Sequence, residues 1–290
     1  MKSATKELLN LFSNDVHIFY WRGAKNSNFG DQLNIDIMEY FGYKPIHSTP
    51  GNAELFALGS ILHFYNNDYN GIIVGSGYIM PPNNVPNLKS AKILALRGPI
   101  TNSFLGNLKI TLCDPGLLAK KIFGEKKSKI YQAGIVPHFD DANDINLNYF
   151  LERYKNVICI DALKKPKDVI ELISQCDLIL SSSLHGLVIA DSYNIPAVWV
   201  NFADRQTGGE FKYFDYHKSL GIHRERVDIV EDSTLDFLKK YAVKVSSSIT
   251  DDKASEIEFI FNNLKKHLVI LRFKRFVKRV FNSLPILNKI

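Results

Sequence analysis

Short apolar runs that alternate with helical patterns constrain the fold of this chain more than any other sequence feature. The first half contains five runs with the composition of strands: VHIFYW, LFALGSIL, GIIVGSGYI, KILALRG and ITLC. After the first run, FGDQLNIDIMEYFG has the pattern of a helix that ends at Gly42. Asp114 is placed to cap a helix that opens with Pro115. This alternation predicts an α/β fold with a mainly parallel sheet.

A second series of the same kind begins after the lysine-rich stretch GEKKSK. Its strand and helix patterns are KIYQAGIVPHFDD, NVICIDAL, KPKDVIELISQC, DLILSSS, LHGLVIADSYN and IPAVWVNF. We therefore predict two Rossmann-like domains that face each other across a cleft, at residues 1–124 and 125–250, followed by C-terminal helices at 251–290. Ligands of such sheets bind at the carboxyl ends of the strands, in the loops that lead into helices.

The formal net charge of the 290-residue chain is +6, which favours an acidic partner. Nucleic acid, anionic lipid and small phosphorylated substrates all meet that description, so charge alone does not choose among them. The sequence contains no RRM-type or zinc-finger pattern and no P-loop, HExxH or CxxC spacing. We therefore predict neither a nucleic-acid partner nor a bound metal.

The three cysteines, Cys113, Cys159 and Cys176, are widely spaced and lie next to apolar residues, which argues against a disulfide framework. We predict buried thiols in a reducing compartment. The stretch MKSATKELLNLFSND has no apolar core of the length that a signal peptide needs. No run approaches the ~18 apolar residues of a membrane span, so we expect a cytoplasmic location.

The tail HLVILRFKRFVKRVFNSLPILNKI interleaves basic and apolar residues. At helical spacing its aromatic and aliphatic side chains gather on one side, as an interfacial helix on anionic lipid requires. The alternative is a helix that packs on its own domain and leaves a solvated basic face. The sequence leaves both interpretations open.

The stretch SSSLHG lies where a predicted strand ends and a helix begins. Ser181, Ser182 and Ser183 end the strand, and His185 and Gly186 open the helix. Backbone N–H groups and hydroxyls converge at such a place, where a phosphate is readily held. An imidazole with the ordinary pKa of about 6.5 can pair with a phosphate or transfer a proton near neutrality. The structural alternative is a histidine satisfied by local hydrogen bonds.

Three further polar positions follow predicted strands. Arg97 precedes a Gly-Pro turn, where its guanidinium can bind a carboxylate or phosphate, or form a structural salt bridge. Asp31 opens the first helix, either as its cap or as a general base for a sugar hydroxyl. His138 precedes Asp140 and Asp141, either as an acid/base group or as part of a polar loop.

Seven stretches, taken in order, resemble motifs of the polysaccharide pyruvyl transferase family. They are NFGDQLN, GSGYIM, LRGPIT, DPGLLA, GIVPHFDD, SQCDLILSSSLHGLVIADSYNIPAVWVNF and GGEFKYFDYHKSLG. The resemblance runs from Asn28 to Gly221, and its longest stretch is quite specific. The N-terminal segment and the basic tail lie outside it.

The resemblance implies a fold similar to the two-domain glycosyltransferase B architecture and an enzyme that uses phosphoenolpyruvate. Members of the family move pyruvate from this donor onto two hydroxyls of a sugar, as a cyclic ketal, on a cell-surface polysaccharide or its lipid-linked precursor. The implied partners are phosphoenolpyruvate, as donor substrate without a further cofactor, and a saccharide acceptor. Because a lipid-linked acceptor lies at the inner face of the cytoplasmic membrane, the basic tail would bring the cleft to its substrate.

The resemblance and the chemistry together assign a role to each candidate. His185 is expected to be the acid or a phosphate ligand, and His138 is a second acid/base candidate. Asp31 is expected to be the base toward the acceptor, and Arg97 the anchor of the donor. The turn at 181–183 and the adjoining Gly186 would supply N–H groups and hydroxyls to the donor's phosphate and carboxylate.

The downstream stretch ADRQTGGEFKYFDY is predicted to be a loop that closes over the donor. Arg205, Lys212 and Tyr216 are its candidate contacts, and Lys212 is preferred. Many family members carry a cation just before the Leu-His pair, where this chain has Ser183. That departure raises the demand on Arg97 and Lys212 to balance the charge of the donor.

A sugar-nucleotide glycosyltransferase of the same architecture is the strongest alternative, because similar helix termini bind a diphosphate. No acidic residue is clearly placed to hold a ribose, although Glu210 is a candidate. A non-catalytic carbohydrate-binding or scaffold protein is the third interpretation. It predicts that replacement of His185 and Arg97 leaves the function intact.

Overall fold

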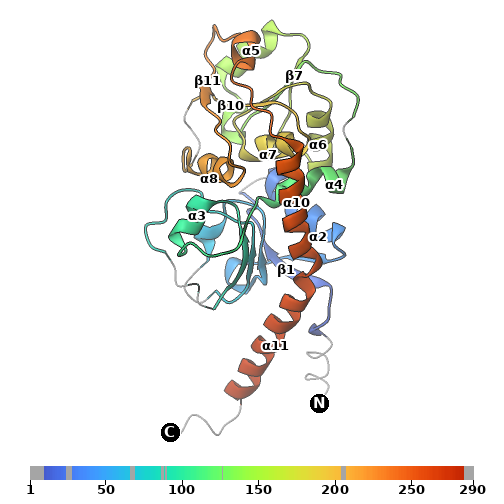
Figure 1. Cartoon of the computed structure of the whole chain (residues 1–290), viewed down its shortest axis with the longest axis vertical. Coiled ribbons are helices and arrows are strands. Elements are labelled where there is room, and N and C mark those ends of the chain that lie inside the picture. Colours follow the sequence, from blue (N-terminus) through green and yellow to red (C-terminus); the bar gives the residue numbers. More distant parts are fainter. Residues whose placement is uncertain are drawn as a thin grey trace.

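The structure, a computed structural model, describes residues 10–23, 28–65, 69–85, 88, 90–125, 127–203 and 207–283. These residues form two α/β domains, one above the other in Figure 1, with the last two helices running back along the first domain. Each domain is built on one sheet, and all the named strand pairs in both sheets are parallel. The predicted α/β fold with two Rossmann-like domains is confirmed.

The N-terminal domain holds a six-stranded sheet in the order β2-β1-β3-β4-β5-β6. Its strands are β1 (Asp15–Phe19), β2 (Lys44–His47), β3 (Leu55–Phe56), β4 (Ile72–Val74), β5 (Lys92–Leu96) and β6 (Thr111–Leu112). Its helices are α2 (Phe29–Tyr40), η1 (Pro50–Asn52), η2 (Leu62–Phe64), α3 (Pro99–Phe104), η3 (Pro115–Leu118) and α4 (Ala119–Phe123), where η marks a 3₁₀ helix.

The C-terminal domain holds a five-stranded sheet in the order β11-β10-β9-β7-β8. Its strands are β7 (Ala133–Val136), β8 (Val157–Cys159), β9 (Ile179–Ser181), β10 (Ala197–Asn201) and β11 (Arg226–Asp228). Its helices are η4 (Phe139–Asp141), α5 (Ile145–Arg153), α6 (Pro166–Ser174), α7 (Leu184–Ser192), α8 (Phe211–Ser219) and α9 (Leu235–Lys239).

The two sheets share one strand order when the strands of each are counted from the start of their own domain. In both, the second strand lies on one side of the first, and the third and later strands continue on the other side. The order therefore reverses between β1 and β3, and again between β7 and β9. Open parallel sheets bind ligands at the carboxyl ends of the strands where the order reverses. The topology thus singles out the loops after these four strands.

The elements predicted from the sequence lie at the expected places with shorter bounds. Helix α2 ends at Tyr40, and Gly42 just beyond it has a φ of +77°, in the left-handed region that favours glycine. Asp114 caps as predicted, accepting a hydrogen bond from the Gly116 N–H at 2.8 Å, although the helix that it caps is 3₁₀. Cys159 is exposed, so the prediction of three buried thiols was wrong, because β8 is an edge strand.

The largest cluster of buried apolar side chains extends through both domains. It joins Leu58 and Val74 of the first domain to Leu187 and Val188 on α7. A backbone hydrogen bond of 2.8 Å from Phe29 N–H to the carbonyl of Ala162 also connects the two domains. Because this shared core is apolar and continuous, we expect the two domains to hold a fixed relative position.

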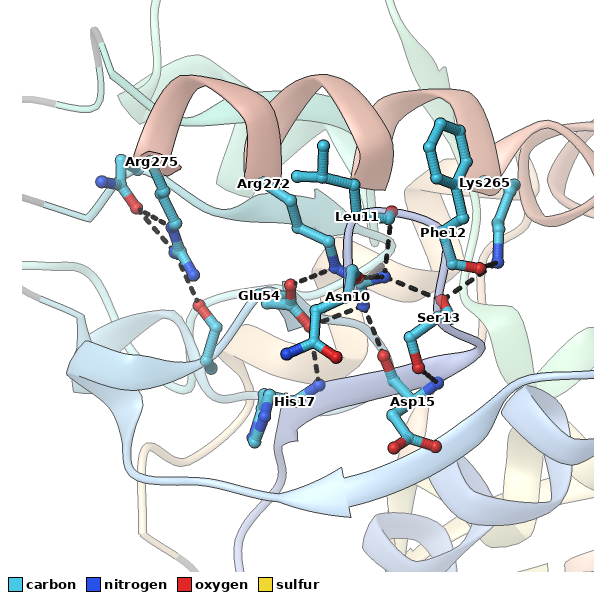
Figure 2. A network of polar contacts seen from close by, with 12 residues as sticks. Asn10, Leu11, Phe12, Ser13, Asp15, His17, Glu54, Lys265, Arg272 and Arg275 are labelled. Carbon is cyan, nitrogen blue, oxygen red and sulfur yellow. Dashed lines mark hydrogen bonds and ion pairs between the residues drawn. The ribbon is translucent and has the colours of Figure 1, made fainter. Parts of the chain in front are cut away.

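Helices α10 (Ser247–Asn262) and α11 (Leu264–Ser283) return to the N-terminal domain (Figure 1). Figure 2 shows Arg272 of α11 against Glu54, with Nε and Oε1 2.7 Å apart. Arg275 reaches Asn70 Oδ1 in the same way, at 2.6 Å. The predicted tail helix is therefore present and two of its arginines face its own domain. No helix in the described part of the chain is long and apolar enough to cross a membrane.

The apolar side chains of α11 are divided between two faces, whereas the sequence predicted a single apolar side. Leu271 is buried against the domain. Ile270, Phe273 and Phe281 are more than half exposed. The division arises because the ion pair of Arg272 with Glu54 fixes which side of the helix faces the protein. The last predicted tail residues, 284–290, lie outside the described residues.

Candidate active site

A cavity of about 370 Å³ lies between the domains, at the four loops that the topology singles out. The N-terminal domain contributes residues that follow β1 and β3, and the C-terminal domain contributes residues that follow β7 and β9. Among the lining residues are Asn28, Asp31, Ser60, His138, Ser183, His185 and Lys212. The predicted cleft is thus present, and five of the predicted site residues meet in it.

His185 lies in the first turn of α7 and is 9% exposed. Its imidazole meets Phe29 edge to face at 6.4 Å, and a Cβ on Gly30 would overlap the ring. The motif glycine before Asp31 is therefore explained by close contact with His185. Nε2 of His185 has no hydrogen-bond partner among the described residues. A buried polar atom without a partner, on a residue that lines the cavity, makes His185 a candidate ligand contact.

Burial lowers the pKa of His185 to about 3, and the positive charges of Arg97 and Lys212 act in the same direction. Without a bound anion the imidazole is therefore neutral near pH 7. A bound anion would offset the two cations and raise the pKa of His185, because an adjacent negative charge favours the protonated ring. The predicted role as an acid hence depends on an anionic ligand.

Asp31 lies in the first turn of α2, where Asn28 is the N-cap. Asn28 Nδ2 donates to Asp31 Oδ2 at 2.5 Å, and the Asp31 N–H donates to Asn28 Oδ1 at 3.0 Å. Burial raises the pKa of Asp31 to about 7, against the opposing effects of the Asn28 hydrogen bond and of Lys212. A carboxyl that titrates near neutrality is suited to exchange a proton with a substrate hydroxyl.

Lys212 reaches the cavity from the first turn of α8 and is 6% exposed. Burial lowers its pKa to about 8, and nearby Arg97 contributes, while Asp31, Asp140 and Asp141 act in the opposite direction. The prediction that this whole stretch is a loop was wrong, because Lys212 belongs to helix α8. Its prediction as a residue of the site agrees with its position.

Tyr216 does not reach the cavity, although it lies one turn after Lys212. It is fully buried, and its hydroxyl donates to Asp191 Oδ2 at 3.0 Å. Asp191 also pairs with Arg224 at 2.8 Å. Tyr216 thus stabilises α8, and its predicted contact with the donor is replaced by this structural role. Arg205, the third candidate from this stretch, lies outside the described residues.

Arg97 is fully buried and does not line the cavity. Its Nε donates to Asp215 Oδ2 at 3.0 Å, its Nη1 to Ser60 Oγ at 2.6 Å and its Nη2 to the Tyr78 carbonyl at 2.6 Å. Arg97 was predicted to anchor the donor directly, but its guanidinium is already hydrogen-bonded to three groups of the protein. Its neighbour Ser60 lines the cavity, so Arg97 supports the wall rather than forming it.

Asp215 was missed by the sequence analysis, and it links the domains. It comes from α8 and accepts hydrogen bonds from Thr101 N–H at 2.8 Å and Thr101 Oγ1 at 2.7 Å, at the start of α3. Asp215 follows Lys212 by three residues on the same helix. The pair of Arg97 with Asp215 therefore fixes the position from which Lys212 enters the cavity.

The three serines before α7 have different environments. Ser181 Oγ lies 2.9 Å from the Val136 carbonyl and accepts from the Ser183 N–H at 3.0 Å. Ser182 Oγ donates to Asp141 Oδ2 at 2.7 Å. Ser181 and Ser182 are fully buried, so their predicted contact with a phosphate is not supported, and of the three only Ser183 lines the cavity.

Gly186 and His138 complete the predicted set. A Cβ on Gly186 would overlap the Ser181 hydroxyl, so this glycine allows close packing and does not line the cavity. His138 lines it, and its N–H donates to Ser182 Oγ at 2.9 Å. Burial and the charge of Lys212 lower the pKa of His138 to about 3. The ring is neutral near pH 7 and can accept a proton only weakly.

Comparison with known proteins decides the family. The sequence model of the family "Polysaccharide pyruvyl transferase" matches residues 6–204, more than two thirds of the chain. The chain belongs to the polysaccharide pyruvyl transferase family. This confirms the resemblance found in the motifs, and the matched residues carry Asp31, Arg97, His138 and His185. Lys212 lies beyond them.

Two relatives of this pyruvyl transferase family member are informative. The succinoglycan biosynthesis protein ExoV of Rhizobium meliloti (strain 1021) is 26% identical over 222 residues, which cover 70% of this chain and 65% of that protein. The chain thus matches slightly less than two thirds of the length of ExoV. An uncharacterised protein of Acanthamoeba polyphaga mimivirus is 27% identical over 285 residues, which cover 90% of this chain and 94% of the other.

The pyruvyl transferase chain also aligns with a solved structure of the wall teichoic acid polymerase TagF. The alignment covers 93% of this chain and 91% of that one, at 11% identity and a TM-score of 0.42. Identity and score are both too low to transfer a residue role.

Proposed function

We propose that the cavity transfers pyruvate from phosphoenolpyruvate to two hydroxyls of a sugar, forming a cyclic ketal during polysaccharide synthesis. Membership of the family supports pyruvyl transfer, and the similarity to ExoV supports a role in polysaccharide synthesis. One observation carries the finer proposal. Lys212, a buried cation, and the first turn of α7 adjoin the same cavity as His185 and Asp31, the two groups that can exchange the protons of the reaction.

The donor is a small anion with a phosphate and a carboxylate. Helix amino termini and ammonium groups bind such anions, and the start of α7 and Lys212 provide both at this cavity. Ser183, the N-cap of α7, adds a hydroxyl that makes no capping hydrogen bond. These groups replace the cation that many family members carry at position 183.

Donor binding also prepares the acid. The donor's negative charge raises the pKa of His185, so that the imidazole takes up a proton when the cavity fills. The protonated ring, whose Nε2 has no partner within the described structure, can then donate to the donor. Proton transfer from it to the methylene carbon turns the enol into an oxocarbenium-like centre at C2.

The acceptor adds in two steps. Asp31 takes the proton of the first hydroxyl, whose oxygen forms a bond to C2. The bond from C2 to the phosphate oxygen then breaks, and phosphate leaves with the electron pair. The second hydroxyl closes the ring on C2 and its proton ends on phosphate. In the net reaction, the two hydroxyls lose two protons, the methylene carbon gains one to become a methyl group, and the released phosphate gains the other.

Glu210 is the candidate ribose contact of the glycosyltransferase alternative. It pairs with Arg226 at 3.1 Å and does not line the cavity. The alternative therefore loses its candidate ribose contact. Calorimetric titration with uridine and guanosine diphosphate sugars tests it directly, and nucleotide-sugar binding without phosphoenolpyruvate binding would favour it.

Product analysis tests the proposed reaction. Incubation with phosphoenolpyruvate and a sugar acceptor should give an acceptor whose mass increases by one pyruvate less one water, and whose carbon NMR spectrum contains a ketal carbon. An acceptor that gains a hexose from a nucleotide sugar, or that remains unchanged in every case, would contradict the proposal.

We further propose that the acceptor is lipid-linked and that α11 binds an anionic membrane surface on the cytoplasmic side. The outward face of α11 exposes Ile270, Phe273 and Phe281 beside Lys274 and Lys278. Apolar side chains flanked by lysines on one helix face are typical of interfacial helices on anionic lipid. Their outward position leaves these side chains available to a surface.

Deletion of the tail is a poor test, because it would leave the buried carboxylate of Glu54 without Arg272. The double variant Phe273→Asp/Phe281→Asp changes only the exposed face. It should lose binding to vesicles of phosphatidylglycerol and phosphatidylcholine and keep the thermal stability of the wild type. Vesicle binding equal to that of the wild type would contradict the membrane proposal. Phe259→Asp on α10, which changes an exposed phenylalanine outside α11, is the matched control and should keep vesicle binding.

A further inference from the structure

Three of the aromatic side chains that line the cavity are exposed. Trp21 follows β1, Phe64 ends η2 and Phe139 begins η4, so both domains contribute. Their exposed fractions are 45%, 40% and 46%. Single exposed aromatic residues are common on proteins, but a group of them at one cavity marks a binding surface.

Packing behind the rings holds them in place. Trp21 stacks on Phe64 with ring centroids 5.0 Å apart and an angle of 20° between planes. Phe64 in turn packs on the buried ring of Phe19 at 5.3 Å. Phe139 packs on His138 at 4.2 Å. Aromatic rings fixed in this way offer flat apolar area and lose little conformational entropy when a ligand binds.

The cavity therefore has two chemically different ends. Asp31, His185 and Lys212 are all at most 9% exposed and form its polar interior. The aromatic rings form its outer part. An anionic donor fits the interior, because an aromatic face gives no hydrogen bond to a phosphate or carboxylate. A sugar ring has an apolar C–H face that can lie on an aromatic ring and a hydroxyl edge that can point away from it.

We propose that Trp21, Phe64 and Phe139 form the acceptor subsite, where a hexose ring stacks and directs two hydroxyls toward Asp31. The orientation of the two hydroxyls toward Asp31 rests on the proposed function, whereas binding of the saccharide to the rings does not depend on it. Exposed His63 and Asp140 adjoin the rings in the same cavity and offer polar contacts to the remaining hydroxyls. These polar groups favour a saccharide over a lipid chain as the occupant.

Steady-state kinetics with two varied substrates provides the first test. Trp21→Ala and Phe64→Ala should raise the KM for a methyl glycoside acceptor about 5- to 50-fold, with the KM for phosphoenolpyruvate unchanged within about twofold. Methyl glycosides are chosen because an aromatic aglycone would itself stack on the rings. Trp21→Phe should restore most of the loss. Phe237→Ala, an exposed phenylalanine on α9, is the matched control and should leave both KM values unchanged.

Fluorescence measures acceptor binding without the reaction. The chain has two tryptophans, Trp21 and the buried Trp199, which stacks on Tyr213. In the variant Trp199→Phe the indole of Trp21 is the sole tryptophan signal, and titration with a methyl glycoside in the absence of donor should shift and saturate its emission. The variant Trp21→Phe should show no such change.

The outcomes separate this inference from the proposed function. A saturable change at Trp21 without pyruvyl transfer would support the saccharide subsite and overturn the reaction. Pyruvyl transfer with an unchanged acceptor KM in both alanine variants would overturn the subsite and leave the reaction intact. A response to octyl glycosides but to no methyl glycoside would overturn the saccharide in favour of a lipid occupant.

Discussion

Arg97 of the N-terminal domain and Asp215 of the C-terminal domain form an ion pair of 3.0 Å in which both side chains are fully buried. The pair joins β5 of one sheet to the helix that carries Lys212, since Arg97 directly follows β5 and Asp215 lies on α8. It therefore connects the stability of the domain interface to the geometry of the cavity. An exposed salt bridge would contribute far less to the stability of an interface, because solvent screens the two charges.

Removal of one partner should be costly. Arg97→Met leaves the Asp215 carboxylate buried without its cation, and we expect a loss of about 3–5 kcal/mol in the free energy of unfolding, measured by urea titration. The double variant Arg97→Met/Asp215→Leu should recover part of the loss, because no buried charge remains. The exposed pair of Lys239 and Asp236 provides the control, and Lys239→Met should cost about 0.5 kcal/mol or less. Wild-type stability of Arg97→Met would show that the pair does not hold the interface.

Asp31 should make the protein less stable at alkaline pH. Its pKa of about 7 in the folded protein lies above the ordinary value of 3.8, so the folded chain binds this proton more tightly than the unfolded chain does. The stabilising contribution is complete below pH 4 and is lost as the pH rises to 7. Asp31→Asn should therefore raise the melting temperature at pH 8 by the equivalent of about 1–2 kcal/mol and leave it nearly unchanged at pH 4. An equal effect at both pH values would contradict the pKa shift.

Lys212 should control donor affinity through its charge. Because its pKa is about 8, phosphoenolpyruvate binding, measured by calorimetry, should weaken as the pH rises above 8. Lys212→Met should lower the affinity at least about tenfold at pH 7. Lys212→Arg, which stays charged, should remove the loss above pH 8. Exposed Lys218 on the same helix supplies the control Lys218→Met, and an equal effect of the two methionine variants would argue against a direct role for Lys212.

Gly30 should tolerate no side chain, because a Cβ there would overlap the imidazole of His185. Alanine ordinarily stabilises a helix relative to glycine by about 0.5–1 kcal/mol, but here Gly30→Ala should displace His185 and reduce kcat at least about tenfold. Gly51→Ala is the matched control, since nothing lies within 4 Å of its added Cβ. A Gly30→Ala enzyme with the kcat of the wild type would show that the position of His185 is not critical.

The sequence predicted the parts of the site that depend on local position. Asp31, His138 and His185 follow the carboxyl ends of strands that alternate with helices, and that rule alone brings them to one cavity. It could not predict the environment of Arg97, because the partner Asp215 lies 118 residues away in the chain. The direction of each hydroxyl in the serine run depends likewise on the neighbouring strand, which the sequence does not reveal.

The orientation of α11 illustrates the same limit on a larger scale. The amphipathic pattern predicted the helix, but several faces of it combine basic and apolar residues. The contact of Arg272 with Glu54, across 218 residues, decides which face turns inward. The aromatic rings of Trp21 and Phe64 were missed for the same reason, because they are 43 positions apart and meet only in the folded chain.

Phosphate release from phosphoenolpyruvate, measured with and without a panel of methyl galactosides, glucosides and N-acetylmannosaminides, tests the central claim most directly. The account predicts release that depends on one of these acceptors and that falls at least about 100-fold in His185→Ala. The exposed His223 gives the control His223→Ala, which should keep the wild-type rate. Release that needs no acceptor, or an unchanged rate in His185→Ala, would contradict the assignment of this cavity as the site of pyruvyl transfer.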